Sequence, residues 1–368
     1  MASKRRLFNR LILVSLDWCR PKDPPVSLAV GSLLASVRAR LPGVESELLS
    51  FNMNDSEFDS ALVLEALLKL KPDSHTLVGF GTYIWCERPV QQLLKELRKM
   101  KFPATVCVGG PQVTNSLDHP RDFYPDGDVF IRGYAETPLV ELMSKPTEKD
   151  RCPVIRGVVY CDGLDNKQQA YVDLAKLPSP YLSGAITVDK FARLETSRGC
   201  PFRCTFCQHR DAGDLPLGKR RFGSLDRTVA EVRHLAVEGV TDIAVVDPTF
   251  NSGPHYLKVL DAFRQAKFVD GRLKLSLQCR FEMVTNEFLD KIEACREYGI
   301  EVTLEFGLQT AVKEEYGPIR RSNNLKKVTR VIAELHSRKI PFEVSLIYGL
   351  PLQTLDTFKQ SIAFCRRN

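Results

Sequence analysis

A chain of 368 residues is long enough for two domains of ordinary size, each with a core of its own. The net charge of +7 is spread along the chain, so solvated surface charge explains it better than a nucleic-acid partner does. Eleven cysteines without a secretory signal predict a reducing compartment. Because no stretch approaches the roughly 20 apolar residues of a membrane helix, a cytoplasmic protein without a membrane partner is expected.

Residues 1–145 alternate between apolar runs typical of buried strands and stretches with helical spacing. The expected strands are 11–16, 44–51, 75–80, 105–108 and 128–131. The expected helices are 27–41, 56–70, 89–100 and 137–143, the second of them capped by Asp55 or Ser56. This alternation predicts a doubly wound parallel sheet of the flavodoxin or Rossmann type, with ligands at the carboxyl ends of its strands.

Residues 146–192 have a different composition and are expected to form a hairpin and a linker. The runs 154–160 and 169–172 predict the two strands of the hairpin, with Asp162-Gly163 at its turn. The proline-bearing segment 177–181 follows, and it is the expected boundary between the two domains.

Residues 193–368 resume the alternation of strands and helices. The expected strands are 192–196, 242–246, 273–278, 301–306 and 342–347. The expected helices are 227–238, 254–266, 286–298, 325–338 and 355–366. Five such units predict an α/β domain with an open or partial TIM-like barrel, whose active site lies at the carboxyl ends of the strands.

Three cysteines, Cys200, Cys204 and Cys207, stand in a short loop directly after the first strand of this second domain. Soft thiolates favour iron–sulfur clusters or zinc over hard cations. A four-iron cluster normally takes four cysteines, so a loop with three leaves one iron open to a substrate or cofactor. Zinc needs a fourth thiolate or a histidine, which His209 could supply. Three ordinary core cysteines without any ligand are the remaining alternative.

The stretch from Glu195 to Cys207 also resembles the signature of the radical S-adenosylmethionine (SAM) superfamily, in which a CxxxCxΦC loop follows the first barrel strand and Phe206 fills the aromatic position. The flanking residues are similar to those of members that carry a cobalamin-binding domain ahead of the barrel. The resemblance implies a [4Fe-4S] cluster held by Cys200, Cys204 and Cys207. It also implies that SAM chelates the open iron and is cleaved reductively to a 5'-deoxyadenosyl radical.

The resemblance extends over residues 193–364, and each further match falls at the end of an expected strand. It implies that SAM lies near Phe206. It also implies that Asp247 contacts the amino group of SAM and that Arg280 contacts its carboxylate. It further implies contacts from Gln309 and Thr310 to the ribose or amino group, and from Ile347 and Gly349 under the adenine. Asp247 could instead cap a turn, and Arg280 could instead pair with a neighbouring acid. The family core usually has six strand–helix units, and here the last strand is missing from the expected set.

Three fragments of the first domain, 79–83, 108–114 and 131–136, resemble the cobalamin-binding domain of one large subfamily. The implied cobalamin contacts are Gly79, Thr82, Tyr83, Gly109, Gly110, Gln112, Thr114, Gly133 and Glu136. A flavodoxin-like fold without a corrin would place similar glycines at these strand ends. The loop after the first strand lacks the usual cobalt-ligating histidine, so no cobalt ligand is named. Trp18 and Trp85 could line a corrin face or pack inside the fold.

These features predict a radical SAM enzyme, and with cobalamin bound, a methyltransferase acting on an unactivated carbon. The alternatives are radical oxidation, rearrangement or methylthiolation, and a degenerate protein that binds a cluster without catalysis. The expected partners are a small-molecule or peptide substrate and an external flavodoxin-like or ferredoxin-like electron donor. The sequence does not identify the substrate.

Overall fold

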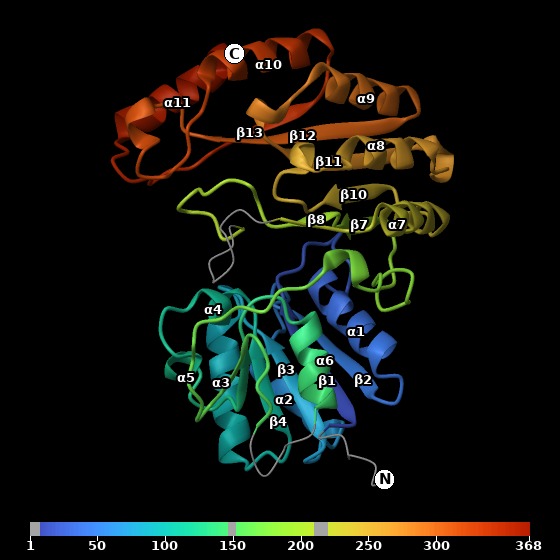
Figure 1. Cartoon of the computed structure of the whole chain (residues 1–368), viewed down its shortest axis with the longest axis vertical. Helices are drawn as coiled ribbons and strands as arrows, with labels where there is room; N and C mark the ends of the chain where they lie inside the picture. The colour runs from blue at the N-terminus through green and yellow to red at the C-terminus, as the bar shows by residue number, and fades with distance from the viewer. Residues whose placement is uncertain (1–7, 146–151, 210–219) are drawn as a thin grey trace. The chain divides into compact units, whose positions relative to one another are not determined.

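The protein is described here by a computed structural model, which places residues 8–145, 152–209 and 220–368. The chain divides into two compact units. The first comprises residues 1–172 and 177–187, and the second comprises residues 173–176 and 188–368 (Figure 1).

The first unit is built on a six-stranded sheet with the order β2-β1-β3-β4-β5-β6. Its strands are parallel except for β6, which runs antiparallel to β5. The strands are β1 (Arg10–Asp17), β2 (Glu45–Asn52), β3 (Thr76–Gly81), β4 (Thr105–Gly109), β5 (Val129–Ile131) and β6 (Val158–Tyr160). The helices are α1 (Leu28–Arg40), α2 (Ser60–Lys69), α3 (Glu87–Lys99), α4 (Pro111–Asn115), α5 (Pro120–Phe123) and α6 (Glu136–Ser144).

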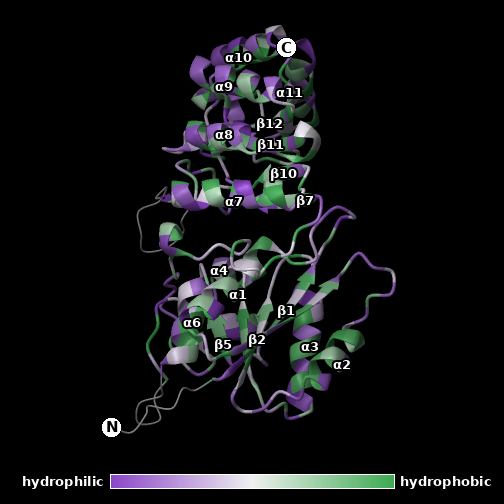
Figure 2. Ribbon diagram, turned by 90° about the vertical axis from the view of Figure 1, so that its right-hand side faces the viewer, coloured by the Kyte–Doolittle hydropathy of each residue, from purple (hydrophilic) through white to green (hydrophobic). Residues whose placement is uncertain are grey.

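Helices cover both faces of this sheet, and its inner strand β1 is accordingly apolar on both sides. On one face of β1, Ile12 and Val14 pack with α2 and α3. On the other face, Leu11 and Leu13 pack with α1 and α6. Figure 2 shows the two helical layers with the sheet between them. The doubly wound parallel sheet predicted from the sequence is therefore present.

Two local predictions for the first unit are wrong. The segments 154–160 and 169–172 do not form a hairpin, because Val158–Tyr160 pairs with β5 and Ala170 bridges Gly133 in parallel. The sequence of a short alternating segment does not specify the strand with which it pairs. Here Val158–Tyr160 pairs with the open edge of β5 instead of with residues 169–172. Helix α2 begins after Asp59, which accepts a hydrogen bond from the Ala61 amide, rather than after Asp55 or Ser56.

The second unit contains a five-stranded parallel sheet with the order β13-β12-β11-β10-β7. Its strands are β7 (Phe191–Leu194), β10 (Asp242–Val245), β11 (Leu273–Cys279), β12 (Ile300–Gln309) and β13 (Phe342–Leu346). Two short strands, β8 (Ser197–Arg198) and β9 (Arg221–Phe222), pair antiparallel beside it. The helices are α7 (Leu225–Val237), α8 (Tyr256–Gln265), α9 (Asn286–Glu297), α10 (Leu325–Ser337) and α11 (Leu355–Arg367). Short 3₁₀ turns are η1 (Leu174–Lys176), η2 (Phe250–Ser252), η3 (Val269–Gly271), η4 (Phe281–Met283) and η5 (Lys313–Glu315).

The helices of this unit form where the sequence pattern predicts them. In α10, the buried residues Val328, Val331, Ile332 and Leu335 recur at helical spacing and turn one face to the core. Because the five strands are parallel, their carboxyl ends lie along one edge of the sheet, and this edge carries the site described next. Among the described residues, no helix is both long enough and apolar enough to cross a membrane.

Candidate functional site

The cysteine loop leaves the carboxyl end of β7 and lies at the edge where the parallel strands end. Gly199, at φ +80°, turns the chain from β8 into Cys200 in a conformation that favours glycine. Cys204 is buried, whereas Cys200 and Cys207 are partly exposed. Burial raises the pKa of the Cys207 thiol, and the nearby Cys200 and Cys204 raise it further. The three thiols therefore share one electrostatic neighbourhood.

Each of the three sulfurs has a polar neighbour. Cys200 Sγ lies 3.4 Å from the Thr249 hydroxyl, and the His209 amide donates to Cys207 Sγ at 3.4 Å. The Arg321 guanidinium donates to Cys204 Sγ at 3.8 Å. The two N–H donors stabilise negative charge on sulfur, as iron–thiolate ligation requires, whereas either atom of the Thr249–Cys200 contact can be the donor.

The donor set is three thiolates, which favour iron–sulfur clusters or zinc over hard cations. In the part of the chain that the structure describes, no three histidine, cysteine, aspartate or glutamate side chains are placed to ligate one metal ion. In a four-iron cluster each thiolate binds a different iron, and the assignment of the three cysteines to such a cluster stays a prediction.

The loop is fixed to the rest of the unit by two contacts that the sequence did not reveal. The Thr205 amide donates to the carbonyl of Ile319 at 3.0 Å. The guanidinium carbon of Arg280 lies 3.6 Å from the centroid of the Phe202 ring, inside the loop itself. Arg280 also pairs with Glu282 at 2.9 Å. The structure thus brings Arg280 to the cysteine loop, while its contact with a SAM carboxylate stays a prediction.

Asp247 is almost completely buried and uses both carboxylate oxygens inside the protein. It accepts hydrogen bonds from the amide and hydroxyl of Thr196 and from the amide and hydroxyl of Ser197. Burial raises its pKa, although these four donors counteract that rise. In the structure Asp247 therefore holds the strand that leads into the cysteine loop, and its predicted contact with the SAM amino group is untested.

The ends of β12 and β13 carry the remaining predicted SAM residues. Gln309 adopts φ +70°, and its carbonyl accepts a hydrogen bond from the Ile347 amide at 3.0 Å, which brings the two strand ends together. The Thr310 side chain is fully buried and lies 3.3 Å from Ser361 in α11. Gly349 adopts φ +87°, and Phe206 is 42% exposed. Of this group, Thr310 is the residue whose side chain points into the protein interior.

Arg220 also lies at the site, and sequence reasoning missed it. Its guanidinium donates to Ser252 at 2.8 Å, to Ser197 at 2.9 Å and to the carbonyl of Thr249 at 3.2 Å. Burial lowers the pKa of Arg220, and the charges of Asp247 and Cys200 oppose that change. Nothing in the sequence links Arg220 to Thr249, because their contact depends on tertiary structure.

In the first unit, Gly110 and Gly133, both predicted for cobalamin, lie at the carboxyl ends of β4 and β5, where the backbone itself requires glycine. Gly110 has φ +107°, and a Cβ there would meet the Thr82 carbonyl at 2.6 Å. Gly133 has φ +86°, and a Cβ there would meet the Ala170 carbonyl at 2.3 Å. The Thr82 amide also donates to the Gly109 carbonyl at 2.7 Å. These contacts explain the glycines without a ligand, so their role toward cobalamin stays a prediction.

The other residues predicted for cobalamin contact one another or the sheet. The observed contacts are Gly79 against Leu13, Tyr83 stacked on Trp85, Gln112 donating to Glu87, Thr114 accepting from the Gly133 amide, and Glu136 accepting from Ser32. Trp18 and Trp85 are 59% and 40% exposed after β1 and β3. They leave aromatic surface open at this edge of the sheet.

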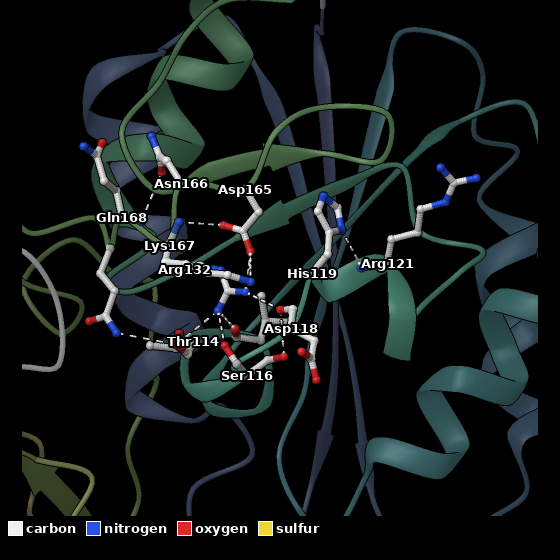
Figure 3. Close-up of polar contacts among 12 residues, drawn as sticks. Thr114, Ser116, Asp118, His119, Arg121, Arg132, Asp165, Asn166, Lys167 and Gln168 are labelled. Carbon is white, nitrogen blue, oxygen red and sulfur yellow. Dashed lines mark hydrogen bonds and ion pairs between the residues drawn. The ribbon is translucent and has the colours of Figure 1, made fainter.

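A buried arginine next to Gly133 organises the same edge (Figure 3). Arg132 donates to the carbonyls of Val113, Ser116 and Asp118 at 2.7, 2.9 and 2.8 Å. It also pairs with Asp165 at 2.6 Å. One guanidinium therefore joins the loop after α4 to the segment around residue 165.

Comparison with protein-family models matches residues 194–365 to the Radical SAM superfamily. The chain is 25% identical over 309 residues to the 2-(S-pantetheinyl)-carbapenam-3-carboxylate methyltransferase of Streptantibioticus cattleyicolor. It is 25% identical over 316 residues to the cobalamin-dependent radical SAM methyltransferase TokK of Streptomyces tokunonensis. These alignments cover 78% and 80% of this chain but 44% of each relative, so the chain spans less than half of their length.

Two solved structures share the fold over nearly the whole chain. The radical SAM methyltransferase TsrM from Kitasatospora setae has a TM-score of 0.73 at 18% identity, covering 97% of this chain and 71% of its own. The cobalamin-dependent SAM radical enzyme OxsB has a TM-score of 0.72 at 18% identity, covering 97% of this chain and 52% of its own. Residues 194–365 are a radical SAM domain, and the superfamily recognised from the cysteine loop is confirmed. The predicted fold class, a doubly wound sheet followed by a partial radical SAM barrel, is confirmed as well.

Proposed function

We propose that this chain is the core of a cobalamin-dependent radical SAM methyltransferase that transfers a methyl group to an unactivated carbon. The observation that carries the proposal is the loop of Cys200, Cys204 and Cys207 at the carboxyl edge of a parallel sheet within the matched domain. The names of the relatives point to the same chemistry. The proposed organisation is a cobalamin-binding domain at 1–145, a segment at 146–192 that leads from it, most of which belongs to the first compact unit, and the radical SAM domain at 193–368.

The three cysteines would hold a [4Fe-4S] cluster whose open iron takes SAM. When bound, the cluster supplies the electron that cleaves SAM. Two arginines surround the loop and can balance anionic charge there: Arg280 stacks on Phe202, and Arg321 donates to Cys204. Ile347 and Gly349, at the end of β13, would contact the adenine. An external flavodoxin-like or ferredoxin-like protein would deliver electrons, and the substrate would be a small molecule or a peptide.

Cobalamin would bind at the carboxyl edge of the first sheet, where Trp18 and Trp85 expose aromatic surface. Ligands of doubly wound sheets bind at this edge. Large, flat ligands gain free energy from stacking on such rings. A methyl group carried by cobalamin could then be transferred to a substrate radical. The cytoplasm, which is reducing, would suit an oxygen-sensitive cluster.

The assignment is tested by replacing each loop cysteine with alanine in anaerobically reconstituted protein. Each of Cys200→Ala, Cys204→Ala and Cys207→Ala should lose the visible cluster absorbance and the formation of 5'-deoxyadenosine under dithionite. Cys365→Ala, a matched substitution of a partly buried thiol in α11, should keep both. Zinc in place of iron in the wild-type chain, or full activity in a loop variant, would refute the proposal.

A second candidate keeps the radical chemistry without methyl transfer. It is favoured by Gly110 and Gly133, because a side chain at either position would clash with backbone of the first unit, so the glycines need no corrin to explain them. This candidate performs oxidation, rearrangement or methylthiolation, and it differs from the first in not retaining cobalamin.

A further inference from the structure

Thr249, two residues beyond Asp247, has a hydroxyl with two polar neighbours. The residue is 4% exposed. Its Oγ1 lies 2.7 Å from the carbonyl oxygen of Pro248 and 3.4 Å from Cys200 Sγ. The hydroxyl can donate its single proton to either of them, so the state of Cys200 decides which bond forms.

The backbone of Thr249 is held in place independently of this hydroxyl. Arg220 donates to the Thr249 carbonyl at 3.2 Å, and the Ser252 hydroxyl donates to the same oxygen at 2.9 Å. On the other side of the contact, Thr196 and Ser197 fix the approach to Cys200 through Asp247. The distance between the hydroxyl and the sulfur is therefore set by contacts that a change of the Thr249 side chain leaves intact.

Iron ligation removes the proton from a cysteine, because the thiolate is the ligand. The hydrogen bond between Thr249 and a ligated Cys200 can then run only from the hydroxyl to the sulfur. Rotation of the hydroxyl away from the Pro248 carbonyl exchanges a hydrogen bond to a neutral acceptor for one to an anionic sulfur.

We propose that Thr249 is a positioning residue for the cluster, which donates a hydrogen bond to the sulfur of Cys200 and raises the cluster's reduction potential. Reduction adds one negative charge to the cluster, and a donor to a ligand sulfur stabilises that charge. The buried position of Thr249 strengthens the effect, because water competes little for the sulfur. The inference rests on the proposed function, since it requires the cluster to be bound by Cys200.

The test compares four full-length proteins after anaerobic reconstitution: wild type, Thr249→Ser, Thr249→Val and Thr249→Ala. Serine keeps the hydroxyl, valine keeps the shape of threonine, and alanine keeps neither. The first readout is the iron content of each protein. The second is the midpoint potential of the cluster, measured by electron paramagnetic resonance during a redox titration without SAM. Valine and alanine should both shift the midpoint to more negative potential, whereas serine should stay near the wild type.

Midpoints that follow the size of the side chain rather than the hydroxyl would overturn the inference, as would equal midpoints in all four proteins. A wild-type chain that takes up no iron–sulfur cluster would overturn the proposed function together with the inference. A wild-type cluster with unchanged midpoints in the variants would overturn the inference alone.

Discussion

Arg132 and Asp165 form an ion pair whose side chains are only 2% and 3% exposed. Removing one charge from such a pair leaves the other in the interior without a counter-charge, which destabilises a protein strongly. When Asp165 is replaced, Arg132 keeps its carbonyl partners. The loss of unfolding free energy should therefore fall at the lower end of the range observed for broken buried ion pairs. We expect Asp165→Asn to lower the free energy of unfolding by about 3 kcal/mol, measured by urea denaturation.

The matched control lies in the same segment. Asp162 pairs with Arg121 at 3.1 Å, but these side chains are 85% and 52% exposed. Exposed pairs contribute about 0–1 kcal/mol, so Asp162→Asn should change stability little. Equal losses in Asp162→Asn and Asp165→Asn would contradict the role given to the buried pair.

The loss should also depend on pH. Burial by itself raises the pKa of Asp165, but hydrogen bonds from Arg132 and Lys167 outweigh burial and hold the pKa below its ordinary value of 3.8. The stabilisation is therefore fully present above pH 3.8 and is lost as pH falls through the lower pKa of the folded state. The stability gap between wild type and Asp165→Asn should accordingly narrow in acid.

At the scale of elements, Gly133 joins β5 to α6 where the segment around Ala170 crosses the end of the strand. Gly133→Ala has two costs: a positive φ of 86°, and a Cβ only 2.3 Å from the Ala170 carbonyl oxygen. Gly184→Ala, within the same unit, has a φ of 69° but meets nothing within 4 Å. The control Gly184→Ala should lower the free energy of unfolding by about 1 kcal/mol through backbone strain alone. Gly133→Ala should lower it clearly more, as measured by thermal or urea unfolding. Similar losses in both variants would mean that the crossing segment moves aside without cost.

Strands and helices of the core could be predicted from sequence because burial imposes their patterns locally. The apolar run 11–16 and the helical spacing in 325–338 each report a face that packs inside the protein. The wrong hairpin had the same local signals as a correct one, since the choice of β5 as partner depends on a distant edge. Likewise Asp55, Ser56 and Asp59 are all residue types that cap helices well, so their identity alone could not show that Asp59 is the cap of α2.

The candidate site also has one part that the sequence predicts and another that it does not. The spacing of Cys200, Cys204 and Cys207 could be interpreted directly, because all three ligands lie in one loop. The partners of Asp247 could not be foreseen, because they depend on the register that pairs Leu194 with Val245. That register carries Thr196 to the level of Asp247 two residues further on, where the carboxylate meets its donors.

At the scale of the whole molecule, the proposal assigns one cofactor to each unit, so the two should be separable by mutation. Trp85 stacks on Tyr83 with ring centroids 4.6 Å apart, and its indole N–H donates to the Leu16 carbonyl at 3.0 Å. If cobalamin rests on this aromatic surface, Trp85→Ala should weaken its binding about tenfold, which corresponds to about 1.4 kcal/mol. Iron content and SAM cleavage should stay at the wild-type level, because the cysteine loop belongs to the second unit.

The measurement is the visible spectrum and corrin content after anaerobic gel filtration with cobalamin supplied, beside iron content and 5'-deoxyadenosine formation. Trp85→Phe retains a stacking ring and serves as the control, with near-normal corrin retention expected. Loss of iron together with corrin in Trp85→Ala would show that the two sites do not bind independently. A wild-type chain that cleaves SAM but never retains a corrin would remove methyl transfer from the proposal. The non-methylating candidate would then be the one that fits, since it uses the cysteine loop without the aromatic edge of the first sheet.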